Sequence, residues 1–416
     1  MSIIVQKFGG TSVADSEKIK NVAKAVIGEY KRGHQVVVVV SAMGHTTDYL
    51  VKLADEITQN PSSREMDMLL ATGEQVSISL LAMSIHEAGY PAVSLLASQV
   101  GIITEKVHSK ARILEIKTEK IKSCLDNGQI VIVAGFQGVT PDNEITTLGR
   151  GGSDTSAVAL AAVLNAERCD IYTDVNGVYT ADPRIVKSPS KLKDISYFEM
   201  LELARVGANV LHPRSVETAK QFNVPLRVRS SFYQDDLGTL VIGEEEMEIY
   251  RPVSGVAVDL SQVRIAILKV PDAPGIAARI FGALAEHNVS VDMIIQSFRE
   301  DDSTNNIAFT VAESDLAKAT EVLERVKKEI NASEVLVDNE IAKVSIVGAG
   351  MIDKPGIAAD MFNALAEAGI NIKMISTSEI KISCLVDKDS AHDAVRIIHT
   401  KFNLDQDRIE VTQSVH

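Results

Sequence analysis

The chain has 416 residues, of which 45% are hydrophobic and 24% charged, and its formal net charge is −14. This length exceeds what one ordinary hydrophobic core needs, so we expect roughly two to four domains of a folded, soluble protein. The negative charge argues against a sequence-independent attraction to nucleic acid or to an anionic membrane surface, and neither is expected as a partner.

Three widely spaced cysteines, Cys124, Cys169 and Cys384, indicate reduced thiols rather than a disulfide framework or a zinc site. A strand-like run begins at Ile3 without the features of a signal peptide. No apolar run approaches the ~20 residues that a membrane helix needs. These observations favour a cytoplasmic protein.

Short β-rich runs alternate with helical patterns from residue 1 to about residue 230. The first strand is expected over 3–8 and the second over 36–41, where five consecutive valines are typical of a strand buried on both faces. Apolar residues from Ile19 to Val26 recur at helical spacing after Asp15, which suits a helix cap. Further strands are expected at 92–96, 129–135, 170–173 and 226–229. This alternation predicts an α/β domain with a mainly parallel central sheet flanked by helices.

Two glycine-rich loops carry the candidate chemistry of this domain. The first, Lys7-Phe8-Gly9-Gly10-Thr11-Ser12, follows the first strand and matches neither a Walker A loop nor a G-x-G-x-x-G fingerprint. The second spans 147–156 and precedes an alanine-rich helix. One such loop alone is as consistent with a tight turn as with a binding site. Together, their backbone N–H groups, Lys7 and Arg150 form a positive environment suited to a triphosphate and an acidic substrate.

An internal repeat follows an acidic connector, which we place at 231–252. When the C-terminal part is shifted by 81 residues, nine of the twelve residues in 275–286 are identical to those in 356–367. Each copy has the pattern of a strand, a Pro-Gly turn, a helix and a second strand, followed by a further strand and helix. This pattern predicts two α+β modules of βαββαβ order, which resemble the ACT domain, a small module that binds amino acids. The expected domains are therefore 1–230, then 253–335 and 336–416 after the connector.

Five sequence blocks make the resemblance of the N-terminal domain specific. KFGGTSV (7–13), SAMGHTTD (41–48), ATGEQ (71–75), GRGGSDTS (149–156) and YTDVNGVYTADPR (172–184) occur in the order typical of the aspartokinases, within the amino-acid kinase family. With the two ACT-like repeats, the chain resembles the monofunctional aspartokinases over essentially its whole length. The resemblance implies an amino-acid kinase catalytic domain joined to two regulatory ACT domains.

The resemblance also implies a reaction and its regulation. The implied enzyme, an aspartate kinase, transfers the γ-phosphate of ATP, bound with Mg²⁺, to the β-carboxylate of L-aspartate, the first step of lysine, threonine and methionine biosynthesis. Lysine, threonine or both are the implied feedback effectors. The implied assembly is a homo-oligomer, or a complex with a short regulatory subunit through the ACT domains, and Met247 is a possible start of such a subunit. Two alternatives remain: a kinase of another carboxylate such as glutamate, and an amino-acid sensor with a non-catalytic kinase domain.

The same resemblance implies roles for residues of the first domain. Lys7 and Asp154 are the implied catalytic residues, with Lys7 neutralising charge on the transferring group and Asp154 orienting Lys7 or acting near the metal. The implied nucleotide-binding residues are Lys7, Phe8, Gly9, Gly10, Ser41, Thr173, Asp174, Tyr179, Asp182 and Arg184. The implied substrate-binding residues are Thr47, Glu74, Arg150, Gly151, Gly152 and Ser153. Within this set, Arg150 suits a clamp on the α-carboxylate and Glu74 suits the α-ammonium. No metal ligand is assigned.

The chain departs from the family pattern at Asn209, where many relatives have lysine. Asn209 cannot supply the cationic contact to ATP that the lysine would make. Arg214 is the candidate to replace that contact. His45, His108 and His212 are expected to be loop or surface residues, because the histidines lack metal-ligand spacing.

The effector site is expected at the paired ACT-like modules. The residues expected to contact the effector are Asp272, Gly275, Ile276, Ala277, Asp292 and Gln296 in the first copy and Asn371, Ile372, Ser378 and Glu379 around the second. Asp292 aligns with Lys373 in the repeat, so the two copies differ in charge and are not expected to bind the same ligand in the same way.

Overall fold

The computed structural model describes residues 1–208, 210–233, 235–247, 252–297, 304–352 and 354–406. Contacts divide the chain into two compact units. The first contains Met1–Val178, Lys191–Ala204 and Asn209–Glu248, and the second contains Tyr179–Ser190, Arg205–Ala208 and Ile249–His416. The predicted departure at Asn209 lies outside the described residues.

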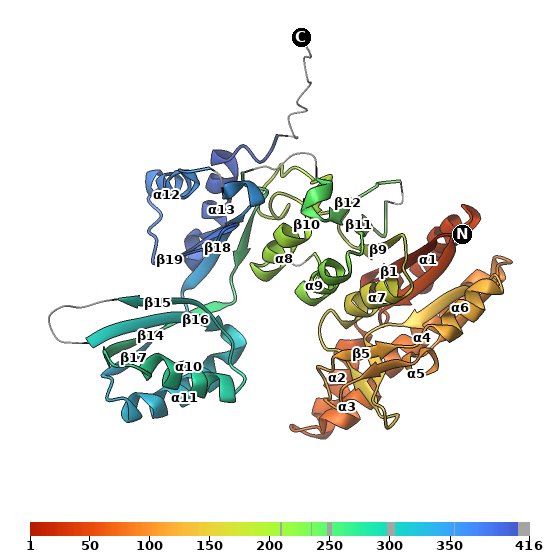
Figure 1. The fold of residues 1–416 in the computed structure, drawn as a ribbon, viewed down its shortest axis with the longest axis horizontal. Helices are drawn as coiled ribbons and strands as arrows, with labels where there is room; N and C mark the ends of the chain where they lie inside the picture. The colour runs from red at the N-terminus through yellow and green to blue at the C-terminus, as the bar shows by residue number, and fades with distance from the viewer. Residues whose placement is uncertain (209, 234, 248–251, 298–303, 353, 407–416) are drawn as a thin grey trace, which may run out of the picture. The chain divides into compact units, whose positions relative to one another are not determined.

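The first unit is built on a mainly parallel eight-stranded sheet, which confirms the predicted fold class (Figure 1). The strand order is β10-β12-β11-β9-β1-β2-β6-β3, and within the described residues every neighbouring pair is parallel except β11 and β12. The strands are β1 (Ile3–Phe8), β2 (Gln35–Val40), β3 (Ala92–Leu95), β6 (Ile130–Ala134), β9 (Arg168–Thr173), β10 (Asp194–Ser196), β11 (Leu226–Ser230) and β12 (Thr239–Ile242). The last of these, β12, lies within the predicted connector 231–252 and extends the central sheet.

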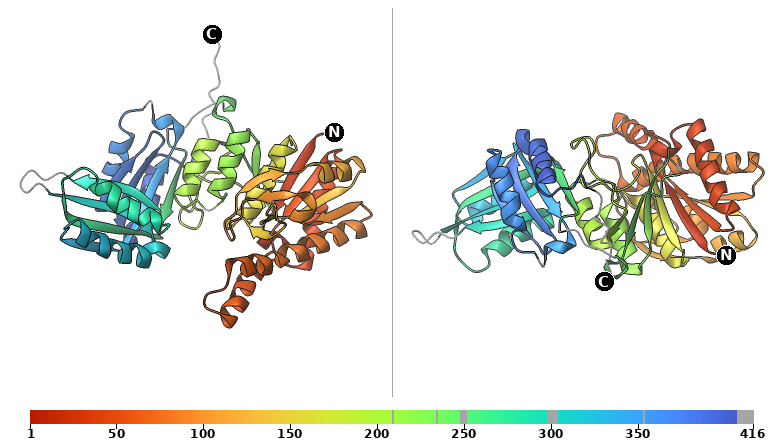
Figure 2. Two further views of the ribbon diagram at one scale, coloured as in Figure 1. Left: turned by 60° about the horizontal axis from the view of Figure 1, so that its bottom comes forward. Right: turned by 90° about the horizontal axis from the view of Figure 1, so that it is seen from above.

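A smaller, four-stranded sheet is formed by strands that lie between β3 and α7 in the chain. Its strand order is β5-β4-β7-β8, with β4 (Ile102–Thr104), β5 (Ile113–Ile116), β7 (Gln137–Val139) and β8 (Ile145–Thr147). The helices of this part of the chain are α1 (Ser16–Lys31), α2 (Thr46–Ile57), α3 (Ser63–Leu70), α4 (Thr72–Glu87), α5 (Ala97–Val100), α6 (Glu119–Asp126), α7 (Gly152–Val163), α8 (Tyr197–Arg205) and α9 (Pro213–Phe222). Figure 2 shows α2 projecting away from the central sheet, in agreement with its lack of buried residues.

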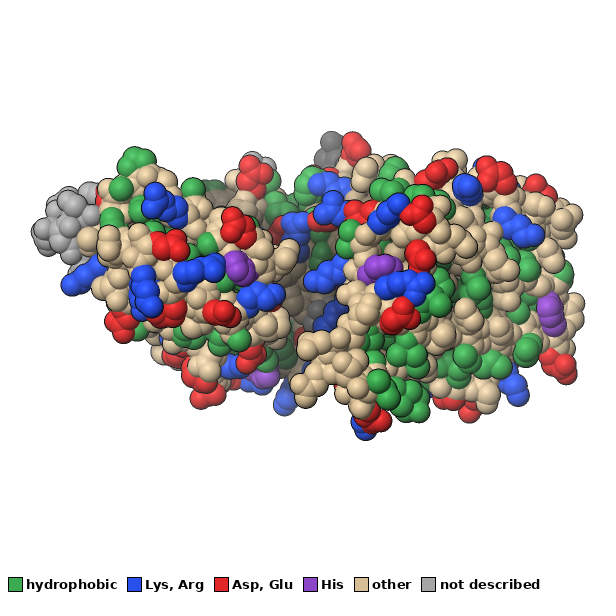
Figure 3. Space-filling model, turned by 90° about the horizontal axis from the view of Figure 1, so that it is seen from below, with side chains coloured by type: hydrophobic (Ala, Val, Ile, Leu, Met, Phe, Trp, Pro, Cys, Tyr) green, Lys and Arg blue, Asp and Glu red, His purple; other side chains and the backbone are tan. Residues whose placement is uncertain are grey.

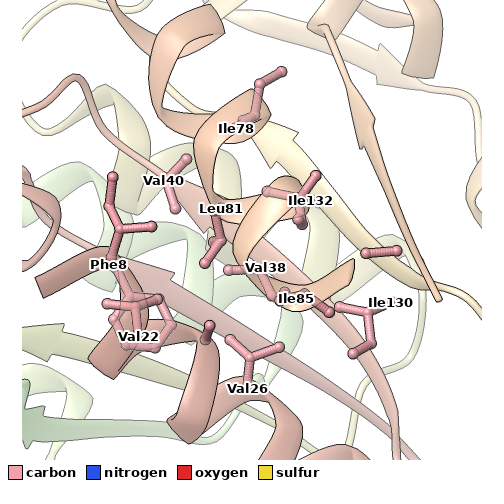
Figure 4. Packing of buried hydrophobic residues seen from close by; sticks show 14 of the residues in the cluster. Phe8, Val22, Val26, Val38, Val40, Ile78, Leu81, Ile85, Ile130 and Ile132 are labelled. Carbon is pink, nitrogen blue, oxygen red and sulfur yellow. The ribbon is translucent and has the colours of Figure 1, made fainter. Parts of the chain in front are cut away.

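The core of the first unit lies between the central sheet and helices α1 and α4. Side chains of α1 and α4, including Val26 and Leu81, point toward the strand residues Val38 and Ile132 (Figure 4). Each of these four residues is fully buried, and such burial contributes about 1.5–3 kcal/mol per large aliphatic side chain. The valines at 36–40 are all buried, which confirms that β2 is covered on both faces. Helix α7 contacts β1, β2 and β9, and it covers the opposite face, because Val37 and Val39 of β2 lie outside the core that α1 and α4 form with the sheet.

Local sequence explains where these helices begin. The carboxylate of Asp15 accepts the N–H of Lys18 at 2.9 Å, so the predicted cap of α1 is confirmed.

One helical stretch, Ser63–Glu87, is long and apolar enough to cross a membrane by length and composition alone. It comprises two helices, α3 and α4, and α4 contributes Leu81 and Ile85 to the core described above, which is the arrangement of a core helix.

The second unit contains two four-stranded antiparallel sheets, each covered by two helices. The first sheet has the order β15-β16-β14-β17, with β14 (Gln262–Pro271), α10 (Ile276–Glu286), β15 (Val291–Ser297), β16 (Thr304–Ala312), α11 (Leu316–Glu329) and β17 (Glu334–Asp338). The second has the order β13-β18-β20-β19, with β13 (Gly255–Asp259), β18 (Ile341–Val347), α12 (Ile357–Glu367), β19 (Met374–Thr377), β20 (Lys381–Asp387) and α13 (Ala391–Lys401). The first sheet has the predicted βαββαβ order.

Strand β13 precedes the first repeat in the chain but belongs to the second sheet. It pairs antiparallel with β18, where Gly255 lies opposite Val347 and Asp259 opposite Lys343. The segment Tyr179–Ser190 also joins this part of the unit, because Ala181 is buried in the same core. The second ACT-like module is therefore completed by one strand, β13, and one segment, 179–190, that precede the first repeat in the sequence.

Acidic and basic side chains are interspersed over the face drawn in Figure 3. Such mixing gives no broad field of one sign over the described side chains of that face, in keeping with the charge argument from composition.

Candidate active site

A pocket of about 890 Å³ lies in the first unit, where β1, β2 and β6 end. Carboxyl ends of parallel strands meet at the same edge of a sheet, and open α/β sheets bind ligands there. The lining residues are Lys7, Gly9, Gly10, Ser41, Thr47, Met66, Leu70, Glu74, Ser109, Lys110, Phe136, Thr147, Leu148, Gly149, Arg150, Gly151, Gly152, Ser153, Asp154, His212 and Arg214. Both glycine-rich loops predicted from the sequence therefore contribute to one pocket.

Lys7 and Asp154 form an ion pair inside this pocket. The ammonium nitrogen Nζ of Lys7 on β1 lies 2.6 Å from Oδ1 of Asp154 in the first turn of α7, and each side chain is 12% exposed. The pair fixes the lysine beside the N-terminus of a helix, where free N–H groups and the helix dipole favour anions. The pocket therefore has a positioned cation and backbone donors on the same side.

The glycines of both loops allow close approach of the backbone. A Cβ atom on Gly10 would lie 2.8 Å from the carbonyl oxygen of Ala42, and the N–H of Gly44 donates to the carbonyl of Gly10 at 2.9 Å. Any larger residue at position 10 would push apart the segments that follow β1 and β2. The glycine therefore holds the first loop against the second strand's end.

His212 packs directly against the second glycine-rich loop. A Cβ atom on Gly151 would lie 2.2 Å from Cγ of His212, and Gly151 has a φ of 67° at the start of α7. Nδ1 of His212 accepts the N–H of Arg214 at 3.3 Å, so a neutral ring carries its proton on Nε2. Burial lowers the pKa of His212, which favours this neutral form. His212 therefore contributes a donor of fixed position, its Nε2–H group, to the residues that line the pocket.

Glu74 is a buried carboxylate at the start of α4. It is 2% exposed, and its Oε1 accepts the N–H of Ala42 at 3.0 Å. Its Oε2 is also buried and has no hydrogen-bond partner among the described residues. Burial raises the pKa of Glu74 to about 7, against the smaller opposing effect of backbone hydrogen bonds. An ammonium group entering the pocket would supply the missing partner.

Arg214 lines the pocket but is already engaged with the backbone. Its guanidinium donates to the carbonyl of Leu148 at 3.0 Å and to that of Ala111 at 2.9 Å. Arg214 thus clamps the second loop to a neighbouring segment, which makes it a poor candidate to replace a missing ATP contact. Arg150 and Lys110 are exposed at the pocket and supply its other cationic side chains.

Comparisons with known proteins agree with this geometry. The sequence profile of the amino acid kinase family matches residues 2–230, and that of the ACT domain matches 268–326 and 344–402. The chain is 54% identical to an aspartokinase of Geobacillus stearothermophilus over 411 residues, covering 99% of this chain and 100% of that protein. It is also 54% identical to aspartokinase 2 of Bacillus subtilis over 404 residues, or 97% and 98% of the two chains. This chain belongs to the aspartokinases.

Solved structures of aspartokinases share its fold. The crystal structure of E. coli aspartokinase III in complex with aspartate and ADP (R-state) has a TM-score of 0.83 at 27% identity and covers 96% of this chain and 99% of that one. The structure of the same protein in complex with lysine and aspartate (T-state) has a TM-score of 0.75 at 28% identity, with the same coverage. Membership of the aspartokinases confirms the prediction of a kinase with ACT domains, rather than a sensor without catalysis.

Eleven of the residues predicted for the aspartokinase site come together in the pocket, namely Lys7, Gly9, Gly10, Ser41, Thr47, Glu74, Arg150, Gly151, Gly152, Ser153 and Asp154. Phe8 is instead 1% exposed and stacks on Tyr172 in the core, with ring centroids 4.4 Å apart. Thr173, the last residue of β9, donates to Asp174 at 3.1 Å, and neither residue is part of the lining. The remaining nucleotide candidates, Tyr179, Asp182 and Arg184, belong to the second unit, where Arg184 makes a forked contact with Asp182.

Other residues of this aspartokinase line the pocket without having been assigned a role of their own from the sequence: Met66, Leu70, Ser109, Lys110, Phe136 and His212, with Thr147, Leu148 and Gly149 of the predicted second loop. His212 was expected to be a loop or surface residue, and it is the loop residue that caps α9, half-buried beside Gly151. The expectation that the histidines bind no metal stays a prediction; within the described part of the chain, no group of three or more His, Cys, Asp or Glu could hold a metal ion. The sequence signal for His212 was the proline that follows it, because Pro at the first helical position marks a helix start and hence an N-cap.

The predicted effector residues lie in three places within the second unit. Asp272, Gly275, Ile276 and Ala277 form the turn into α10, where Gly275 has a φ of 91° and Asp272 accepts from Asn305 at 3.0 Å. Asp292 and Gln296 lie on β15. Asn371 and Ile372 precede β19, and Ser378 and Glu379 follow it. Their role in binding an effector stays a prediction.

Proposed function

We propose that this chain transfers the γ-phosphate of ATP to the β-carboxylate of L-aspartate to form 4-phospho-L-aspartate. The observation that carries the proposal is the Lys7–Asp154 pair, placed beside two glycine-rich loops and the buried carboxylate of Glu74. Further support comes from the E. coli relative, which was solved with aspartate and ADP.

Lys7, Gly9 and Gly10 hold the phosphates in this proposal, together with the N-terminus of α7. Phosphoryl transfer has a loose transition state with charge spread over the phosphoryl oxygens, so placed cations and N–H donors are the main catalytic resource. A carboxyl side chain has a reference pKa of about 3.9, so it is ionised at neutral pH and needs no general base. Lys7 therefore acts by neutralising charge, and Asp154 holds its ammonium in place.

Mg²⁺ accompanies ATP in the proposed reaction. The donor set fits a metal held mainly by phosphate oxygens and water, because among the described residues the carboxylate that pairs with Lys7 is that of Asp154, and Mg²⁺ commonly takes one or two carboxylates beside phosphates. The metal supplies charge neutralisation on the phosphates when it is bound.

Glu74 and Arg150 recognise the two ends of the amino-acid group of the substrate. The unpartnered oxygen of Glu74 takes the α-ammonium, and Arg150 clamps the α-carboxylate in a forked contact. Thr47, Gly151, Gly152 and Ser153 complete the substrate side. Ser41, Thr173, Asp174, Tyr179, Asp182 and Arg184, with the backbone of Phe8, complete the nucleotide side of the proposal.

Regulation is proposed to occur through the ACT domains. Lysine, threonine or both bind at the paired modules and favour a less active state of the kinase domain. The enzyme catalyses the first step of lysine, threonine and methionine biosynthesis. It acts in the cytoplasm. The E. coli relative with lysine bound supports an effector of this kind. A homo-oligomer formed through the ACT domains, or an assembly with a short regulatory subunit, is part of the same proposal.

The test is an ATP-dependent hydroxamate assay, in which hydroxylamine traps the acyl phosphate. Aspartate and glutamate are compared side by side, and lysine and threonine are added to the aspartate reaction singly and together. We expect product with aspartate and inhibition by at least one effector condition. Product with glutamate alone would contradict the proposed substrate, and activity indifferent to both amino acids would contradict the proposed regulation.

A further inference from the structure

Asp67 on α3 is a fully buried carboxylate whose contacts converge on the pocket. It is 0% exposed. Its Oδ1 accepts the hydroxyl of Thr147 at 2.6 Å, and its Oδ2 contacts Nδ1 of His108 at 2.9 Å. The N–H of Ser109 donates to both oxygens, at 3.1 and 3.0 Å. One side chain therefore ties α3 to the end of β8 and to the segment at 108–109.

The segment that Asp67 holds is conformationally strained. Ser109 has a φ of 69°, a left-handed conformation that a residue other than glycine adopts only with strain. Such strain persists where surrounding contacts over-determine the backbone, and it is common at binding sites. The N–H of Ser109 donates to both oxygens of Asp67, and these two hydrogen bonds hold the backbone in this conformation.

This strained turn packs directly on the second glycine-rich loop. The carbonyl oxygen of Ser109 lies 3.0 Å from where a Cβ of Gly149 would be, and the N–H of Ala111 donates to the carbonyl of Thr147 at 3.0 Å. Lys110, between them, lines the pocket and is exposed. The position of Lys110 and the start of the loop that carries Arg150 thus depend on the same carboxylate.

We propose that Asp67 is a positioning residue for the substrate side of the pocket, and that Lys110 is a second cation there for the acidic amino acid. The inference rests on the proposed function. A substrate with two carboxylates requires positive charge at two points, and Arg150 accounts for one. Asp67 acts through the Ser109 turn and Thr147, and none of its described hydrogen bonds reaches Lys7, Gly9 or Gly10, so its loss displaces Lys110 and Arg150 more than these phosphate-binding residues.

The test compares Asp67→Asn with Asp170→Asn in the full chain. Asp170 is a matched control, because it is equally buried but pairs with Arg168 and Arg227 in the sheet, away from the pocket lining. The Asn at position 67 keeps the size of the side chain but places an NH₂ group against donors. We expect the KM for aspartate to rise about tenfold in Asp67→Asn while the KM for ATP changes less than about twofold, since small misplacement of binding groups has large effects. Asp170→Asn should lower the Tm with both KM values unchanged.

Lys110→Met gives a second readout of the same idea. It should raise the KM for aspartate by about five- to tenfold, and the double variant with Asp67→Asn should be no worse than Asp67→Asn alone, because contacts that share one path are not additive. If Asp67→Asn does not fold, Thr147→Val replaces it, with Thr147→Ser as the variant that keeps the hydroxyl and restores the KM.

Two results would overturn the inference: an Asp67→Asn enzyme that loses Tm with an unchanged KM for aspartate, or equal rises in the KM values for aspartate and ATP. Failure of the proposed function is recognised separately, because the unmodified protein would then give no aspartate-dependent product in the same assay.

Discussion

The ammonium of Lys7 lies 2.6 Å from the carboxylate of Asp154, which joins the first strand of the kinase sheet to the first turn of α7. We expect Lys7→Ala to lower kcat by about 10²–10³-fold, the effect of removing one preorganised group that stabilises transition-state charge. Folding should change little, since the lysine is at a pocket and not in the hydrophobic core. Steady-state kinetics with a melting curve checks both statements.

The matched control is Lys18→Ala. Lys18 is a partly exposed lysine outside the pocket lining, and its ammonium lies 3.9 Å from Asp15, so its removal should leave kcat unchanged and the Tm nearly so. A Lys7→Ala enzyme with the kcat of the unmodified protein would mean that the chemistry is assigned to the wrong group.

Glu74 should make both stability and substrate binding depend on pH. Its pKa is raised from 4.5 to about 7 by burial. Between these values the unfolded chain has released the proton while the folded chain keeps it, so the contribution to stability is complete below pH 4.5 and is lost as the pH rises through about 7. The difference corresponds to about 3 kcal/mol. Glu74→Gln should flatten this part of the unfolding free-energy profile, measured from pH 4.5 to 7.5.

Substrate binding should have the opposite dependence, because an ammonium group pairs with the ionised carboxylate. The KM for aspartate should fall as the pH rises from 6 to 8 (about one pH unit either side of the raised pKa), and in Glu74→Gln it should be higher and nearly flat. The KM for ATP serves as the internal control. An aspartate KM with the same pH profile in both proteins would remove Glu74 from the substrate site.

Much of this fold follows from local pattern. Valines at 36–40 predict a buried strand, and the glycine-rich loops that begin at Lys7 and Thr147, each before a helix, predict a phosphate-binding site, because backbone N–H groups and helix N-termini bind anions. The ACT-like modules are visible as a repeat. Each of these signals is contained within a few consecutive residues.

Residues that act through distant partners have no such signal. In the sequence, Asp67 has the pattern of an ordinary charged residue on a helix surface. Its contact with Thr147, 80 positions away, forms only in the folded chain. Strand β13 was likewise not predicted, and its partner proves to be β18 rather than a strand of the adjoining repeat. Pairing and long-range hydrogen bonds depend on the whole topology, so sequence pattern alone leaves them open.

Gly151→Ala should abolish most of the activity. The new methyl group would lie 2.2–2.6 Å from atoms of His212, at a backbone φ of 67° that alanine adopts only with strain. The loop at 149–154 would have to move, and with it Asp154. Gly28→Ala is the control, since a Cβ there meets nothing within 4 Å and lies within α1, where alanine is favoured by about 1 kcal/mol. Equal activity of the two variants would show that the contact with His212 is not restrictive.

The two ACT sheets are joined by an ion pair of unequal burial. Nζ of Lys343 on β18 lies 2.5 Å from Oδ2 of Asp292 on β15, and the lysine side chain is 4% exposed while that of the aspartate is 48% exposed. Removing the aspartate leaves a buried ammonium without its partner, whereas removing the lysine leaves a carboxylate that water can solvate.

The two single variants should therefore differ. Asp292→Asn should lower the free energy of unfolding of the second unit by about 1–3 kcal/mol, and Lys343→Met by less than about 1 kcal/mol, because an apolar side chain of similar size suits the buried position. Calorimetry of the full chain measures both as shifts in Tm. The double variant should resemble Lys343→Met, since the buried charge is then gone. An equal decrease in the free energy of unfolding in the two single variants would contradict this prediction. It would mean that only the attraction between the two charges matters, and that the burial of Lys343 does not.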